Sequence, residues 1–239
     1  MGVGKRSPRS PMALSNAAKY YKELPHQLAA WNELEARLPA HVVDEFMEAY
    51  RNAPEAPQTP QGGIISLQVF EDLTGYRKEL FTQLEVDDFN RLLRETGFDK
   101  DIEATRMLTA NILHETANLK YMKEIASGWA YEGRSDLGNV QPGDGPRYKG
   151  AGVLQLTGRY NYSRLSKALD DPRVMEGVDY VSTTYPFMSA KTWITENDLL
   201  WVAQNEGFDA VCRRINGGWN GYEDRLEKYK ICKKVFNII

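Results

Sequence analysis

The sequence contains few of the residues that build metal sites and disulfide frameworks. Its 239 residues include two cysteines, Cys212 and Cys232, and three widely separated histidines, so zinc-finger and haem-attachment spacings are absent. No run approaches the ~20 consecutive apolar residues of a membrane-spanning helix, and the first residues lack the continuous apolar core of a secretory signal. We therefore expect no metal, no organic cofactor, no integral membrane segment, and synthesis in the cytoplasm.

The charge balance gives no reason to expect nucleic acid as a partner. The formal net charge is -3, with 26% charged and 42% hydrophobic residues, values typical of a soluble globular protein. Lys5, Arg6 and Arg9 make the first residues locally basic. Contact of this stretch with an anionic polymer or a membrane surface is one hypothesis for its role.

Several common catalytic motifs are missing as well. There is no G-x-S-x-G, and His114 is the only histidine after residue 64, which argues against a serine or cysteine nucleophile. The zinc-protease helix motif needs a second histidine four residues after the first, where this chain has Asn118. The glycines in 143–152 are not followed by Lys-Ser or Lys-Thr, so a phosphate-binding loop is not expected. Chemistry based on carboxylates remains.

The chain divides into two parts at a proline-rich stretch. Residues 1–52 carry two amphipathic helical patterns and predict a small N-terminal helical module. The segment APEAPQTPQGG, residues 53–63, holds three prolines and two glycines and is typical of a linker. Residues 64–239 form the second domain.

The second domain has mainly helical periodicity. We predict helices over Ser66–Leu73, Glu85–Arg94, Asp101 to about Lys120, Thr157–Leu169, Thr195–Glu206 and Tyr222–Phe236. Residues 128–158 are rich in glycine, with a short apolar run at Val153, Leu154 and Leu156. We interpret this segment as a long loop with one short β-hairpin, and a shaped loop of that length favours a binding cleft.

Glu115 is the first candidate catalytic residue. In an unbroken helix it shares a stripe roughly 60° wide with Leu108, Ile112 and Leu119. A carboxyl group among apolar side chains tends to keep its proton, which suits a general acid. The structural alternative is a carboxylate at a solvent edge or paired with a cation such as Arg106.

Glycoside hydrolysis needs a second, ionised carboxylate. The nearby choices are Glu124, Glu132 and Asp136. On a continuous helix Glu124 would lie about 13.5 Å beyond Glu115 and on the opposite face. A working pair about 6.5 to 9.5 Å apart therefore requires the helix to end near Lys120 and the chain to fold back.

Three stretches carry a resemblance to a known family. They are HETANLKYMKEI at 114–125, YEGRSDLGNVQPGDGPRYKGAGVLQLTGRYNY at 131–162 and RRINGGWNGYEDRLEKY at 213–229. Together, over roughly Leu67 to the C-terminus, they resemble the family-19 glycoside hydrolases, above all the lysozyme-like branch of bacteriophage endolysins and bacterial wall hydrolases. The resemblance implies a mainly α, lysozyme-like fold and an inverting mechanism. LSNAAKYYKELPHQLAAWNEL near the start resembles accessory segments of such enzymes, which makes the first module a candidate for wall targeting.

The resemblance also implies roles for individual residues. Glu115 matches the general acid, Glu124 matches the base of the phage-type branch, and Glu132 lies nearer the base of the plant chitinases; we favour Glu124. Thr157 matches the hydroxyl that holds the attacking water. The substrate-binding candidates are Tyr148, Gln155, Tyr160, Asn161, Asn216 and Arg225, of which Arg225 is implied to fix the carboxylates electrostatically. The family usually has Gly-Gly where this chain has Ala117 and Asn118, which alters how the helix ends.

Most of these residues have a plain structural alternative. Thr157 is a reasonable helix N-cap, and Asn216 precedes two glycines that are typical of a helix end. Arg225 could form only a surface ion pair with Glu223 or Glu227. Tyr148 is a large aromatic residue that suits a hydrophobic core as well as a sugar platform.

We therefore predict a mainly α protein, in which a lysozyme-like domain with a short β-hairpin and long cleft loops follows a small helical module. The predicted function is an endolysin-type peptidoglycan hydrolase that cleaves β-1,4 bonds with two glutamates. It would be a monomer that binds glycan strands of the wall after release from the host cytoplasm. The alternatives are a chitinase and a catalytically silent glycan-binding protein.

Overall fold

The computed structural model describes His41 and residues 63–236. Contacts divide the chain into Met1–Pro60 and Gln61–Ile239. The predicted helical module and almost all of the predicted linker lie outside the described residues and stay predictions. In the described part of the chain, no helix combines the length and apolar character needed to cross a membrane.

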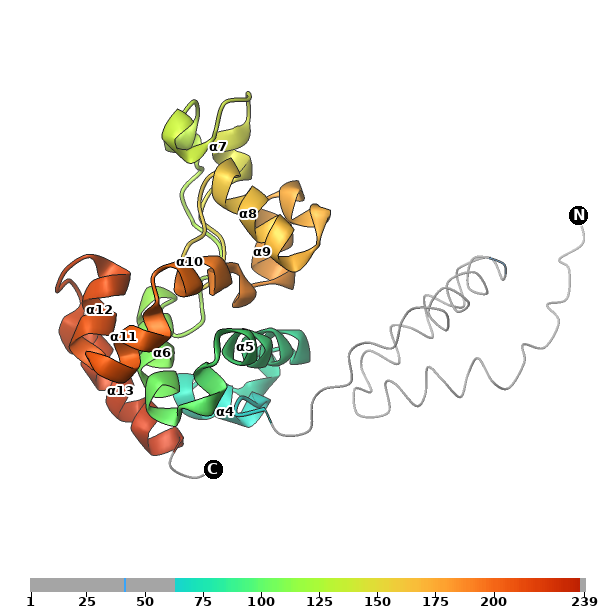
Figure 1. The fold of residues 1–239 in the computed structure, drawn as a ribbon. Helices are drawn as coiled ribbons and strands as arrows, with labels where there is room; N and C mark the ends of the chain where they lie inside the picture. Colours follow the sequence, from blue (N-terminus) through green and yellow to red (C-terminus); the bar gives the residue numbers. More distant parts are fainter. Residues whose placement is uncertain (1–40, 42–62, 237–239) are drawn as a thin grey trace, which may run out of the picture. The chain divides into compact units, whose positions relative to one another are not determined.

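The domain is built almost entirely from helices, as predicted (Figure 1). They are α4 (Leu67–Thr74), α5 (Gln83–Thr96), α6 (Ile102–Glu115), α7 (Asp144–Arg147), α8 (Arg159–Leu169), α9 (Val178–Thr184), α10 (Lys191–Glu196), α11 (Leu199–Asn205), α12 (Phe208–Asn216) and α13 (Tyr222–Val235). Short 3-10 turns connect several of them. The predicted fold class is therefore confirmed.

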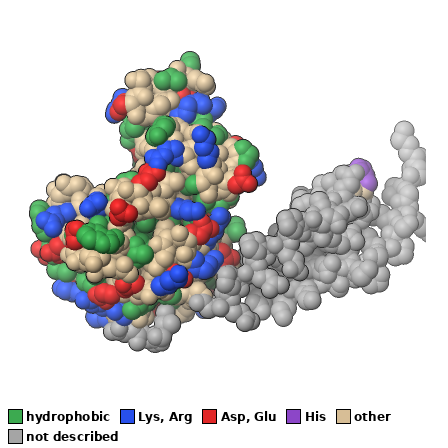
Figure 2. All heavy atoms as spheres, viewed as in Figure 1, with side chains coloured by type: hydrophobic (Ala, Val, Ile, Leu, Met, Phe, Trp, Pro, Cys, Tyr) green, Lys and Arg blue, Asp and Glu red, His purple; other side chains and the backbone are tan. Residues whose placement is uncertain are grey.

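Two hydrophobic clusters divide the domain into two lobes. The large lobe contains α4–α6 and α10–α13 around one cluster. The small lobe, residues 128–185 with α7–α9, is organised by a second cluster that includes Tyr148, Tyr162, Leu165 and Val181. The small lobe stands out from the large one, and positive and negative side chains are interspersed over the face shown in Figure 2.

Helix α6 is the central helix of the large lobe. Asp101 caps its first turn by accepting from the amides of Glu103 and Ala104, both at 3.0 Å, a common way to satisfy free amides at a helix start. Most residues from Ala104 to Leu113 are buried, because α6 packs against α11, α12 and most extensively α13. A helix that is covered on nearly all sides gives its C-terminal residue a fixed position.

Helix α5 is tied to the segment before α10 by a buried carboxylate and an aromatic stack. Asp88 accepts hydrogen bonds from the amides of Phe187 at 2.7 Å and Met188 at 3.0 Å. The rings of Phe89 and Phe187 stack at 4.3 Å. Burial raises the pKa of Asp88 to about 7, against the lowering effect of the two amides and of Arg91.

Two predicted helices differ from the structure, one in its end and one in its continuity. The helix predicted to reach about Lys120 ends at Glu115. The helix predicted over Thr195–Glu206 is two helices, because Asp198 adopts the left-handed conformation with φ 49° between α10 and α11. Thr195 therefore lies inside α10 and does not begin a helix.

The predicted β-hairpin is reduced to single bridges. Ala151 pairs with Lys123 and with Leu156, and no longer ladder forms in the described residues. The turn between them packs tightly, with Val153 and Ala151 buried. Cys212 and Cys232 are buried free thiols, so the described structure contains no disulfide between them.

Candidate active site

The chain leaves helix α6 immediately after Glu115. Ala117, Asn118 and Leu119 all have left-handed backbone conformations, with φ of 50°, 62° and 64°. Thr116 secures this turn, since its hydroxyl donates to the carbonyl of Ile112 at 2.7 Å and accepts from the amide of Leu119 at 2.8 Å. The helix therefore ends at Glu115, five residues earlier than expected, and the chain leaves it through a left-handed turn.

Glu115 is held by a cation rather than by apolar side chains. Its Oε1 accepts from Nη2 of Arg225 on α13, and its side chain keeps 27% of its surface exposed. Leu119 no longer shares a helical face with Glu115, because α6 has ended. The predicted apolar stripe from Leu108 to Leu119 around Glu115 is therefore wrong, whereas the predicted contact of Arg225 with a carboxylate is present.

Arg225 is itself buried, with 1% of its surface exposed. Its Nη1 donates to Oδ1 of Asn111, a buried residue one turn before Glu115, at 2.7 Å. A neighbouring pair repeats the arrangement, since His114 Nδ1 lies 2.6 Å from Oδ2 of Asp224. Two consecutive residues of α6 thus pair with two consecutive residues of α13, and the surface pairing of Arg225 with Glu223 or Glu227 is not what the structure shows.

Glu124 is fixed by a different set of donors. Its backbone amide donates to the carbonyl of Gly150 at 2.9 Å, and the amide of Gly150 donates back to Oε2 at 2.8 Å. Its Oε1 accepts from the hydroxyl of Tyr131 at 3.1 Å. Burial raises the pKa of Tyr131, and the neighbouring Glu124 carboxylate raises it further. The carboxyl group of Glu124 is therefore held at both oxygens while it remains half-buried.

Glu132, the alternative base, has both oxygens bound to backbone. Oε1 accepts from the amide of Gly143 at 2.7 Å and Oε2 from the amide of Gly145 at 2.8 Å. These contacts tie the segment after Trp129 to the start of α7. The arrangement favours a structural role for Glu132.

Gln155 lies beside Glu124, and Thr157 is hydrogen-bonded to Gln155. A β carbon placed on Gly150 would clash with Oε1 of Gln155 and would lie 3.1 Å from Oε2 of Glu124, so these two side chains meet at the Gly150 backbone. Thr157 Oγ1 donates to the carbonyl of Gln155 at 2.9 Å, and Asn161 Nδ2 donates to the carbonyl of Thr157 at 2.8 Å. An alanine at position 150 would therefore displace the amide group of Gln155.

The remaining predicted substrate-binding residues differ in accessibility. Tyr160 is 60% exposed and lies under the guanidinium of Arg164 at 5.5 Å. Tyr148 is only 1% exposed, and its ring packs edge-on against Tyr162 in the core of the small lobe. A side chain buried in this way cannot stack on a sugar, so the prediction for Tyr148 is wrong. Asn216 is the last residue of α12 and is half-buried.

One buried ion pair of the small lobe was not predicted from the sequence. Buried Asp144 accepts from Arg159 Nε at 2.9 Å and Nη2 at 2.7 Å, and this guanidinium lowers the pKa of Asp144. The Arg159 amide donates to Oδ1 of buried Asn139 at 2.8 Å. The two charges lie 15 positions apart in the sequence and on different helices, α7 and α8, so no periodic pattern connects them. Among the residues that the structure describes, no group of three or more His, Cys, Asp or Glu side chains is placed to hold a metal ion.

The chain is similar in sequence to curated family-19 proteins. No family model matches it. It is 33% identical over 107 residues to a glycosyl hydrolase family 19 domain-containing protein of Haemophilus influenzae, covering 45% of this chain and 52% of the relative. It is 35% identical over 137 residues to an endochitinase of Arabidopsis thaliana, covering 54% of this chain and 47% of the relative. The chain thus spans about half the length of the curated relatives it matches.

Solved structures of chitinases share the fold. Chitinase C of Streptomyces griseus aligns with a TM-score of 0.53 at 20% identity, over 74% of this chain and 94% of the neighbour. A bacterial family 19 chitinase aligns with a TM-score of 0.54 at 18% identity, over 72% of this chain and 95% of the neighbour. The helical domain therefore has the lysozyme-like fold of these enzymes. The predicted resemblance to family-19 glycoside hydrolases is confirmed, and the relatives support the predicted enzyme class.

Proposed function

We propose that this protein is a glycoside hydrolase that cleaves β-1,4 bonds between N-acetylated sugars, with Glu115 as general acid and Glu124 as general base. The observation that carries the proposal is the pair of separately held carboxyl groups on either side of the turn at 117–119. Arg225 holds Glu115, whereas the Gly150 amide and the Tyr131 hydroxyl hold Glu124. An inverting mechanism uses two such groups with room for a water between sugar and base.

The contact with Arg225 defines how Glu115 would act. Nη2 of Arg225 occupies Oε1, so Oε2 is the oxygen that carries the proton toward the glycosidic oxygen. When that proton leaves, the carboxylate gains a full negative charge beside a buried guanidinium. Stabilisation of charge that develops in the transition state contributes directly to the rate.

The surroundings of Glu124 suit the activation of water. Its two oxygens accept from a backbone amide and a phenol, contacts that hold the carboxyl group of the proposed base in a fixed position. The Thr157 hydroxyl donates to the carbonyl of Gln155, so the lone pairs of Oγ1 remain to accept a hydrogen bond from the attacking water. Gln155 and Asn161 then supply amide groups for sugar hydroxyls.

We propose peptidoglycan as the substrate, cut after the protein is released from the cytoplasm of the host in which it is made. The resemblance to the lysozyme-like branch supports this choice. Chitin is the second candidate, since the Arabidopsis relative is named an endochitinase and both polymers present the same linkage. Release of reducing ends from purified peptidoglycan but not from chitin oligomers is the expected result. The reverse preference would assign the protein to chitin.

A Glu115→Gln variant tests whether catalysis occurs at this site at all. Glutamine keeps the size of the side chain but cannot donate the proton, so turnover should fall by about 10²–10⁴-fold, while sedimentation with insoluble wall material is retained. Loss of lysis with retained binding would eliminate the catalytically silent glycan-binding alternative. Unchanged turnover on both polymers would eliminate the assignment of Glu115.

A further inference from the structure

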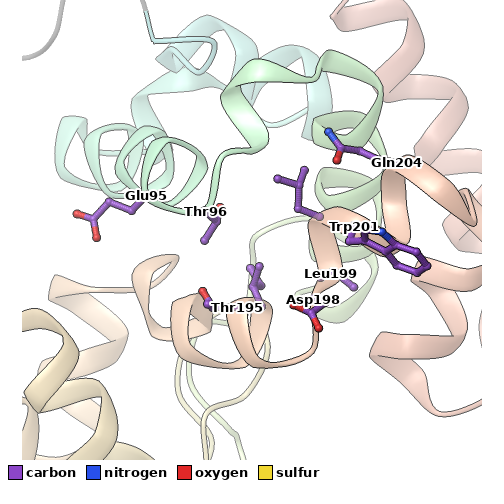
Figure 3. Close-up of a pocket in the computed structure, with 9 residues that line it drawn as sticks. Glu95, Thr96, Thr195, Asp198, Leu199, Trp201 and Gln204 are labelled. Carbon is purple, nitrogen blue, oxygen red and sulfur yellow. The ribbon is translucent and has the colours of Figure 1, made fainter.

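A second pocket lies away from the proposed catalytic residues. Its volume is about 310 Å³, and it opens between the end of α5 and the turn that joins α10 to α11 (Figure 3). Thr96, Thr195, Asp198, Trp201 and Gln204 contribute to its lining. A cavity of this size is at the lower end of the range found for small-molecule sites.

The pocket and Glu115 lie at opposite ends of α6. Gln204 Nε2 donates to Oδ2 of Asp101 at 3.1 Å, and Asp101 is the N-cap of α6. Glu115 is the last of the 14 residues of that helix. At 1.5 Å per residue the two ends are about 20 Å apart, so one ligand ring cannot occupy both places.

Buried apolar side chains line part of the pocket, and the indole of Trp201 lies at its edge (Figure 3). Ile194 and Leu199 are the buried lining residues. Trp201 is 55% exposed, an unusual position for the largest apolar side chain. An accessible indole beside apolar side chains offers a face on which the C–H face of a sugar ring can pack.

The polar groups of the pocket are rich in hydrogen-bond acceptors. Thr96 donates its hydroxyl proton to Leu92 at 2.6 Å and Thr195 donates to Lys191 at 3.0 Å, so both hydroxyl oxygens keep lone pairs. The amide nitrogen of Gln204 is used by Asp101, which leaves Oε1, and Asp198 adds a carboxylate. Such groups accept from the hydroxyl donors of a saccharide.

The charge of the lining excludes anionic ligands. Its nine residues include no Lys or Arg, and Glu95 is already paired with Arg91 and Lys191. A phosphate or carboxylate would meet Asp198 and acceptor oxygens, while the adjacent cations, Arg91 and Lys191, are already bound to Glu95. A neutral, hydroxyl-rich molecule meets no such repulsion.

We propose that this pocket is a second glycan-binding site that takes a neutral oligosaccharide of N-acetylated sugars, stacked on Trp201. The inference rests on the proposed function, because it assumes that the protein acts on such a polymer. Binding at two sites on one polymer raises the effective affinity for an insoluble substrate without a new contact at the active site.

Titration of the full chain with tri-N-acetylchitotriose, followed by backbone amide NMR, tests the proposal. A Glu115→Gln background prevents consumption of the sugar. The expected result is two separate groups of shifted amides, one near 115–124 and one in 195–204. Trp201→Ala should raise the dissociation constant obtained from the second group at least tenfold. Trp201→Phe, which keeps a smaller ring, should raise it less. Tyr76→Ala, which removes an exposed aromatic side chain on another part of the large lobe, should change neither.

The outcomes separate the two proposals. Shifts confined to the surroundings of 115–124, or second-group shifts that Trp201→Ala leaves unchanged, would overturn the second site and leave the proposed function intact. Absence of shifts in both regions would also overturn the second site, and hydrolysis by the wild-type protein then decides the proposed function independently.

Discussion

Asn111 fixes the orientation of Arg225. Its Oδ1 accepts from Nη1 of Arg225 at 2.7 Å, while its own Nδ2 donates to the carbonyl of Met107 at 2.9 Å, which sets which way the amide faces. The other arm of the guanidinium reaches Glu115. A single planar group therefore connects the buried interior of α6 to the proposed general acid.

Arg225→Lys should impair catalysis more than substrate binding. Lysine keeps the positive charge, but a single ammonium does not reproduce a planar fork that reaches both Asn111 and Glu115. We expect kcat to fall at least tenfold with KM little changed, and Asn111 to lose a buried partner, which costs about 1–3 kcal/mol of stability. Arg214→Lys, an exposed position on α12, is the control and should alter neither. An unchanged kcat would remove Arg225 from the mechanism.

Glu124→Gln should lower turnover, whereas Glu132→Gln should lower thermal stability. Loss of the base should lower turnover about 10²–10⁴-fold with only a modest change in stability. Glu132→Gln disturbs two charge-assisted bonds to the amides of Gly143 and Gly145, so thermal unfolding should shift downward while kcat stays within a few-fold of wild type. Collapse of turnover in Glu132→Gln at unchanged melting temperature would identify Glu132 as the base.

Glycine at the turn after α6 should stabilise the protein. Ala117 has φ 50°, a conformation that costs a residue with a β carbon roughly 1–2 kcal/mol and costs glycine little. After the greater chain entropy of glycine is subtracted, Ala117→Gly should gain about 0.5–1 kcal/mol in urea unfolding. Asn118→Gly should gain less, since asparagine tolerates this region. Ala110→Gly within the right-handed part of α6 is the control and should destabilise; a loss of stability in Ala117→Gly would refute the left-handed turn.

Asp88 should make stability depend on pH. Its folded-state pKa of about 7 lies above the ordinary value of 3.8, so between these values the folded protein holds a proton that the unfolded chain has lost. Stability should therefore fall as pH rises from about 4 to about 7, by up to about 1.4 kcal/mol per pH unit from this group. Urea unfolding at both ends of this range measures it.

Asp88→Asn should remove this slope, because an amide does not titrate, and Asp87→Asn on the same helix should retain it. A slope of the same size in wild type and Asp88→Asn would show that other groups cause the pH dependence.

The sequence was sufficient for the helical class and for the central motif, but not for where the chain turns. Leu108 and Ile112 follow helical periodicity and lie in the core as expected. The pattern continues through Leu119, although three residues without a glycine leave the helix at that point. Left-handed alanine has no compositional signal, so only the absence of the usual Gly-Gly marked the position as unusual.

Contacts between distant residues account for most of the remaining differences. The partner of Glu115 is 110 residues away, and no local pattern could choose Arg225 over Arg106. Tyr148 could not be assigned from its type, because an aromatic ring suits a core and a sugar platform equally; packing against Tyr162 decided it. Helices α9 and α12 were not predicted, since seven and nine residues give little room for a periodic signal.

The two proposed catalytic carboxyl groups are anchored to separately packed bodies. Glu115 ends a helix of the large lobe, whereas Glu124 is bonded to Gly150, whose neighbour Ala151 belongs to the cluster of the small lobe. The distance between the acid and the base consequently depends on how the two lobes pack against each other. The two clusters meet at Ala151 and Val153, since Ala151 belongs to the small-lobe cluster and Val153 to the large-lobe cluster. Turnover in such a molecule can be tuned by residues at that seam which never touch the sugar.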